Sequence, residues 1–192
     1  YSQETKFSIY RSLMCLFFTL YSLQNTVNHF INGYNNPFNY KSEDFLDITS
    51  WFFAYIIFDI IKILISKNKR IDLIIHHMFF LIVSFLYINY NKIGYFTNFI
   101  LLAEAISIFS GFDKMEMEKN NMEKSKDYKV YRKKIIKYLR IPIWIILLIV
   151  TLKFTKNQPL IIWYTNVFMS LFMIKMDKYW ENKCNKIIKK YE

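Results

Sequence analysis

Long apolar runs constrain this chain more than any other feature. Six runs of about 18–25 residues follow one another, and the polar residues collect between the runs. A helix rises 1.5 Å per residue, so runs of this length cross the roughly 30 Å hydrocarbon core of a bilayer. Inside lipid every backbone polar group needs an internal partner, which a helix supplies. We therefore expect an all-α polytopic membrane bundle of about six transmembrane helices.

The predicted spans belong to one domain over residues 1–192, and they lie near 7–31, 47–65, 71–90, 93–111, 138–155 and 159–176. Gly33 and Pro37 are expected to break the helix after the first span. A charged connector over 112–137 separates the fourth span from the fifth, and a basic tail over 177–192 follows the sixth. Because the chain begins at Tyr1, we expect it to be a fragment or a processed product.

The positive charge is one-sided with respect to these spans. The formal net charge is +11, and 22 of the 26 Lys and Arg residues fall on the side that holds both termini. Positive residues favour the cytosolic side, so both termini are expected in the cytosol, or in the matrix if the membrane is mitochondrial. The membrane itself is expected to be that of the endoplasmic reticulum. The basic loops are then expected to contact anionic headgroups. No nucleic-acid-binding motif accompanies them, and no nucleic-acid partner is predicted.

Four ionisable residues lie inside the predicted spans at one level. Asp59 stands six residues from the end of its span, His76 and His77 five and six residues into theirs, and Glu104 seven residues before the end of its own. At 1.5 Å per residue each lies about 8–10 Å below the same boundary. Such groups cost about 2.5–3.5 kcal/mol in hydrocarbon and usually line a cavity. We expect a shared intramembrane site.

Helix periodicity adds neighbours to this site. Asp72 lies one turn before His76 and is expected to hold its imidazole. Tyr55 and Lys62 share a helix face with Asp59. The alternative is that Lys62 and Asp59 only pair with each other near the membrane interface and take no part in the site. On the fourth span, Ser107 shares a face with Glu104.

Adjacent histidines point about 100° apart, with two consequences. Both His76 and His77 face the interior only if their helix is central in the bundle, and we predict that it is. Their divergence is also unlike the i, i+4 spacing typical of zinc-binding pairs, so no metal site is predicted.

At these positions the sequence resembles the TLC-domain family, the membrane domain shared by ceramide synthases and several smaller lipid-related proteins. The similar parts are Tyr55 to Asp59, Asp72 with the pair His76-His77, and Asn98-Phe99 with Leu101 to Glu104 and Ser107. Their order and spacing over about residues 50–110 are similar to the smaller, non-synthase branch. Ceramide synthases carry a His and two Asp residues where this chain has Glu104, Ala105 and Ser107.

The resemblance implies a helical bundle that encloses an acyl chain, with the histidine pair at an acyl-transfer centre. The expected reaction moves an acyl group from a thioester such as acyl-CoA to a lipid or amine, without a further cofactor. The expected catalytic residues are His76, His77, Asp72, Asp59 and Glu104. The expected substrate-binding residues are Tyr55, Lys62, Asn98 and Ser107.

Two other classes of function remain open. The chain is also compatible with a non-enzymatic lipid binder or cargo receptor, which would hold an acyl chain without turnover. A structural subunit of a larger membrane complex is the third reading, and it would bury an outer helix face against protein partners in the membrane.

Overall fold

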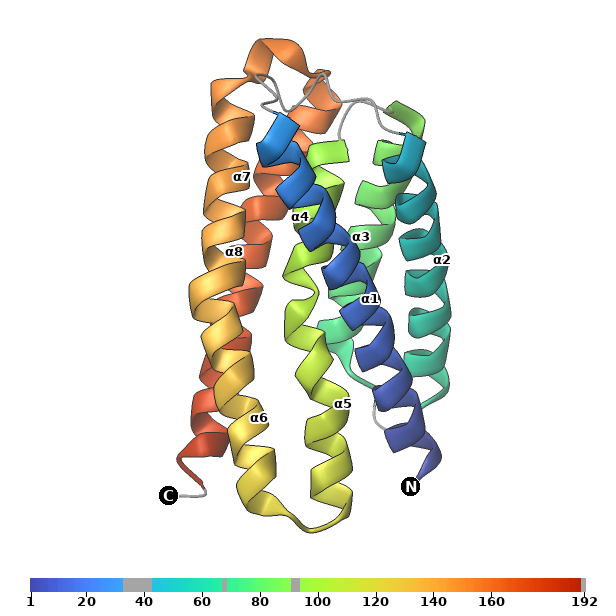
Figure 1. Ribbon diagram of the computed structural model, residues 1–192, viewed down its shortest axis with the longest axis vertical. Helices are drawn as coiled ribbons and strands as arrows, with labels where there is room; N and C mark the ends of the chain where they lie inside the picture. Colours follow the sequence, from blue (N-terminus) through green and yellow to red (C-terminus); the bar gives the residue numbers. More distant parts are fainter. Residues whose placement is uncertain (33–42, 67–68, 91–93, 191–192) are drawn as a thin grey trace.

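The computed structural model describes residues 1–32, 43–66, 69–90 and 94–190. These residues are almost entirely helical, and no strand occurs among them, as the apolar runs predict. The helices stand side by side in an elongated bundle (Figure 1). In chain order the elements are α1 (Gln3–Asn32), α2 (Glu43–Ile65), α3 (Ile71–Tyr90), α4 (Gly94–Ala103), α5 (Ala105–Glu118), α6 (Met122–Ile135), η1 (Ile136–Arg140), α7 (Ile141–Lys153), η2 (Thr155–Asn157) and α8 (Leu160–Ile188).

The long helices form a membrane bundle. Five stretches are long and apolar enough to cross a bilayer: Leu46–Ile65, Ile71–Tyr90, Phe96–Glu118, Met122–Lys153 and Leu160–Ile188. They indicate an integral membrane protein. α1 is not among them, since Arg11 and a polar far end interrupt its apolar run. It crosses the bundle against α4 and α5 instead of standing apart (Figure 1).

Several helices extend beyond the predicted spans. The segment 112–137, expected only as a charged connector, is a helical hairpin made of the end of α5 and all of α6. Asn120 turns this hairpin in the left-handed region at φ 58°, and the side chain of Asn121 caps α6 by accepting a hydrogen bond from the amide of Lys124. α8 likewise continues through most of the expected tail, to Ile188. The expected helix break at Gly33 and Pro37 lies outside the described residues.

The start of α1, the end of α8 and the α5–α6 hairpin lie at the same end of the bundle (Figure 1). This arrangement agrees with a chain that crosses the bundle an even number of times. The lysine-rich segments of the hairpin and of the end of α8 therefore gather at one end, as the charge count predicts.

The prediction that α3 is central is wrong. Of the five apolar spans, Phe96–Glu118 is buried over the largest share of its length, and α3 keeps one face exposed through Ile75, Met78 and Ile82. Its opposite face is broad enough to bury both His76 and His77. Two neighbouring residues about 100° apart thus need a wide buried face, and a central helix is not required.

An aromatic and aliphatic core fills the bundle on one side of the histidines. We use the name aromatic core for the buried residues Phe18, Phe52, Phe80, Phe96 and Leu147. Phe52 packs edge-on against Phe18 and Phe80, with ring centroids 5.2 and 5.8 Å apart. Edge-to-face packing of this kind stabilises a core beyond its buried area. It ties α1, α2 and α3 together.

Small residues bring α1 and α5 into close contact. The hydroxyl of Ser12 donates to the carbonyl of Ser107 at 3.0 Å and accepts from the amide of Gly111 at 2.8 Å. A Cβ atom at Gly111 would overlap the backbone carbonyl of Ser8. Close approach through small residues is typical of helix pairs in membranes. It holds the residues of α1 against the break between α4 and α5.

Candidate functional site

Three helices bring the first imidazole–carboxylate pair together. His77 Nε2 on α3 lies 2.6 Å from Asp59 Oδ2 on α2. The other carboxylate oxygen, Oδ1, accepts from Arg11 on α1, with Nε at 2.9 Å and Nη2 at 2.8 Å. Asp59 is completely buried, so these two partners replace its hydration. The predicted convergence of His77 and Asp59 is therefore present, and Arg11 joins it unpredicted.

The second pair is looser. His76 Nε2 lies 3.7 Å from Glu104 Oε1, while Glu104 Oε2 faces Ser107 Oγ at 3.4 Å and Cys15 Sγ at 3.7 Å. Tyr55 joins this group through Cys15, since its hydroxyl lies 3.5 Å from the thiol. Most of these distances exceed those of strong hydrogen bonds. The carboxylate of Glu104 is thus buried among weak partners and retains acceptor capacity.

Asp72 does not hold His76 as the one-turn spacing predicts. Its carboxylate is 2.6 Å from Arg70 Nη2 and accepts from the indole of Trp180 at 3.1 Å. The indole ring in turn packs edge-on against the imidazole of His76, with centroids 5.2 Å apart. Asp72 therefore acts on His76 only by fixing Trp180, a residue 108 positions away in sequence. The Nδ1 atom of His76 is buried without a hydrogen-bond partner.

Two of the expected substrate-binding residues lie away from this group. Lys62 is exposed on α2 and stands over the ring of Phe58, so it does not pair with Asp59. Asn98 is buried, but its carboxamide donates to Thr26 at 2.7 Å, nearly two helical turns before Glu104. The other two, Tyr55 and Ser107, line the cavity described next.

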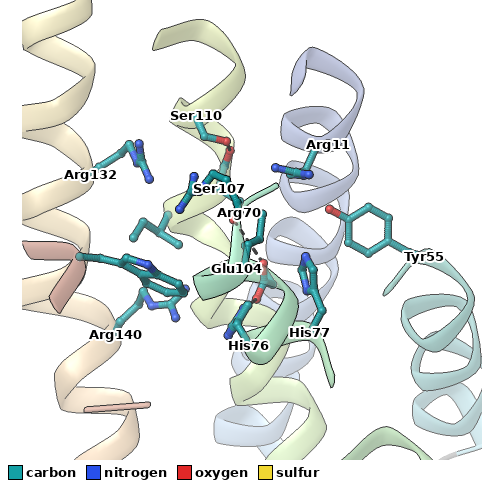
Figure 2. Close-up of a pocket in the computed structure, with 13 residues that line it drawn as sticks. Arg11, Tyr55, Arg70, His76, His77, Glu104, Ser107, Ser110, Arg132 and Arg140 are labelled. Carbon is teal, nitrogen blue, oxygen red and sulfur yellow. Dashed lines mark hydrogen bonds and ion pairs between the residues drawn. The ribbon is translucent and has the colours of Figure 1, made fainter. Parts of the chain in front are cut away.

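A small polar cavity lies among these side chains (Figure 2). Its volume is about 40 Å³. A buried water needs roughly 10–15 Å³ on this measure, so the cavity holds about three waters or one small polar group. It does not enclose an acyl chain as the resemblance implied. Tyr55, His76, His77, Glu104 and Ser107 all contribute to its wall.

Four arginines complete the wall, although from the sequence we expected them only to set the topology. Arg132 and Arg140 reach the cavity from one side and Arg11 from the other, with Arg70 between them (Figure 2). The chain has 22 lysines and only these four arginines. No lysine of the described chain lines the cavity. This contrast between Lys and Arg was visible in the sequence, and it is the signal that could have found the site.

Two helix irregularities place the buried Arg140. The turn at Glu104 tightens, because the amide of Ser107 bonds the carbonyl of Glu104 at 2.9 Å and leaves that of Ala103 free. Arg140 Nη1 donates to this freed carbonyl at 2.8 Å, and its Nε lies 2.9 Å from Asp177 Oδ1. Arg140 itself ends the π-helical segment η1. Interruptions of this kind are frequent at functional sites.

We use the name polar cluster for Arg11, Asp59, His76, His77, Glu104, Arg140 and Asp177. Within the part of the chain that the structure describes, no group of three or more His, Cys, Asp or Glu side chains is arranged to hold a metal ion. The polar cluster places imidazole nitrogens beside carboxylates, and guanidinium groups stand around the small cavity. That combination is suited to proton transfer and to holding an oxygen-rich group.

Comparison with models of protein families, with curated proteins and with solved structures gives no match.

Proposed function

We propose that this integral membrane protein handles lipids in the manner of the smaller TLC-domain proteins. In this proposal it transfers an acyl group from a thioester donor to a lipid or amine acceptor, at the positive, cytosolic side of an endoplasmic reticulum membrane. The observation that carries the proposal is the meeting of His76, His77 and Glu104 at the wall of one cavity, with Asp59 paired to His77 behind that wall.

His76 is the proposed general base. Its Nε2 faces Glu104, which favours the tautomer with the proton on Nε2 and leaves a lone pair on the unpartnered Nδ1. That nitrogen would take the proton of the acceptor hydroxyl or amine as the acceptor attacks the thioester carbonyl. The carbon–sulfur bond then breaks, and the departing thiolate receives the proton from the imidazolium. A positioned base of this kind contributes about 10²–10⁴-fold to a rate.

His77 and Asp59 are proposed as the positioning pair. The short contact of 2.6 Å between them, together with the bond from Arg11 to Asp59, holds one imidazole in a fixed orientation beside the other. The two imidazole centroids are 5.2 Å apart. Because the cavity is small, only the reacting head group would enter it, and the acyl chain would stay in the bilayer against the apolar helix faces.

A non-enzymatic lipid binder is the second candidate. One observation favours it: every arginine at the cavity has a carboxylate neighbour, so the wall is ordered without a substrate. Such a protein would retain a lipid head group and would not turn it over.

Mass spectrometry tests the proposal. The purified full chain would be incubated with an isotope-labelled long-chain acyl-CoA and a membrane lipid extract, and new acylated species would be sought. The variant His76→Ala/His77→Ala should abolish them, whereas the control Lys62→Gln, which removes an exposed cation on a neighbouring helix, should retain them. Labelled products that persist in the histidine variant, or their absence from the unaltered protein, would contradict the enzymatic proposal.

A further inference from the structure

The geometry points to a phosphate-binding site formed by the four arginines at the cavity. This inference deepens the proposed function, on which it rests, by assigning the class of ligand group that the same cavity takes. The phosphate belongs either to a lipid headgroup or to a soluble phosphate compound, and the chemistry of recognition is the same for both.

The first support is the distribution of the cations. Arg11 lies on α1 and Arg70 immediately before α3, whereas Arg132 and Arg140 lie on the continuous helix Met122–Lys153, so they approach from three separate segments. A lysine would serve as well for charge alone, and the chain uses lysine everywhere else. A guanidinium differs from an ammonium by its planar array of five donors, which matches the oxygens of a phosphate in pairs. The choice of Arg at this cavity therefore fits an oxyanion.

The second support is how these guanidinium groups are held. Arg11 pairs with Asp59, Arg70 with Asp72 at 2.6 Å, and Arg140 with Asp177. None of these three carboxylates lines the cavity. Among the described residues, Glu104 is the one acid that does. The partners therefore orient and neutralise the guanidinium groups without presenting acceptor oxygens to the cavity.

The third support is donors left without acceptors. Arg140 is 1% exposed, and its Nη2 has no hydrogen-bond partner. Arg132 Nε is also buried without one, and its Nη1 is only loosely paired with Asp113, at 3.8 Å. Asp113 is occupied by Lys129 and Ser125. Buried N–H groups of a cation are costly to leave unpaired, so an acceptor that enters the cavity gains what they lack.

Shape favours phosphate over carboxylate. A carboxylate is planar and offers two oxygens, whereas a phosphate presents three or four in a tetrahedron. Donors that converge from three separate segments suit the tetrahedral group. The volume of about 40 Å³ admits one such head and excludes the remainder of a large ligand.

Binding is tested on the purified full chain in neutral detergent. Sodium phosphate should raise the melting temperature relative to sodium chloride at equal ionic strength, and sodium acetate should not. In a second arm, native mass spectrometry would follow retention of phosphatidic acid against diacylglycerol of the same chains. Stabilisation by inorganic phosphate alone assigns a soluble source, and retention of phosphatidic acid assigns a lipid. Neither effect, or an equal effect of acetate, would overturn the inference.

The variant Arg132→Lys keeps the charge and changes the donor geometry, and its weak pairing with Asp113 makes loss of fold a small risk. It should lower the affinity for the phosphate ligand about tenfold, as expected for losing one charged hydrogen-bond pair. Lys137→Gln is the matched control, since it removes an exposed cation between Arg132 and Arg140, and it should leave the affinity unchanged. Equal affinities in Arg132→Lys and the unaltered protein would contradict the assignment.

Assays of the unaltered protein separate this inference from the proposed function. Acyl transfer without phosphate binding would overturn the inference alone, and phosphate binding without acyl transfer would overturn the proposed function alone.

Discussion

The polar cluster and the aromatic core occupy adjacent parts of the same helices and are held together by different forces. In the polar cluster, ion pairs such as Arg140 with Asp177 and His77 with Asp59 join helices distant in sequence. In the aromatic core, side chains such as Phe52 interact with their neighbours by shape and dispersion alone. Lipid is as apolar as the core, so packing of this second kind gives modest stability in a membrane. Lipid offers no substitute for the ion pairs of the polar cluster. The geometry of the polar cluster is therefore more specific than that of the aromatic core.

The largest expected effect comes from breaking the most buried ion pair. Asp177→Ala leaves the guanidinium of Arg140 and the indole of Trp144, which now lies 2.9 Å from Asp177 Oδ2, without that acceptor. Removing one partner of a buried pair costs about 3–5 kcal/mol. Unfolding by sodium dodecyl sulfate, followed by circular dichroism, should show this loss. A loss below 1 kcal/mol would mean that the cluster contributes no more than ordinary packing.

A large truncation in the aromatic core should cost less. Phe52→Ala removes a buried ring, a change that costs about 3–5 kcal/mol of stability in soluble proteins. We expect a loss of about 2–3 kcal/mol here, because lipid also surrounds apolar side chains favourably. Phosphate affinity should stay within twofold, since Phe52 does not line the cavity. The same unfolding assay measures the first quantity, and the melting-temperature titration measures the second. A tenfold loss of affinity would show that the two regions are not separable.

The contact between α1 and α5 lies next to the polar cluster and combines close packing at Gly111 with the hydrogen bonds of Ser12. Gly111→Ala places a methyl group against the carbonyl of Ser8 and should destabilise by about 1–2 kcal/mol, as overpacking does. Because α1 carries Arg11, the shift should also weaken phosphate binding. Unchanged stability in Gly111→Ala would show that the helices separate freely.

The smallest expected effect concerns a buried hydrogen bond outside the polar cluster. Tyr87→Phe removes the bond from the phenol to Asn166 Oδ1, which is 2.6 Å long. Interhelical hydrogen bonds in membranes average about 0.6 kcal/mol. We expect a loss of that size in the unfolding assay and no change in ligand binding. A loss above 2 kcal/mol would show that this hydrogen bond stabilises the bundle about as much as a buried ion pair does.

Length and depth along the helices were predictable from the sequence, and they brought His76, His77, Asp59 and Glu104 together correctly. Both depend on local quantities, the rise per residue and the position within an apolar run. The same reasoning failed for Asp72, because the one-turn spacing to His76 competes with an indole on α8 that no local rule reveals.

The arginines were missed for a related reason. Arg11 meets Asp59 across 48 residues, and Arg140 reaches the carbonyl of Ala103 only because two helices are irregular. Neither the tightened turn at Glu104 nor the π-helical segment η1 has a sequence signature of its own. Only the composition indicated the arginines, since the chain is rich in lysine and all four of its arginines line one cavity.

The most direct test of the account measures turnover and fold in the same preparation of His76→Gln. We expect acyl transfer to fall about 10²–10⁴-fold, the contribution of a general base, while the unfolding midpoint in detergent stays close to that of the unaltered protein. Undiminished transfer by a folded His76→Gln protein would contradict it.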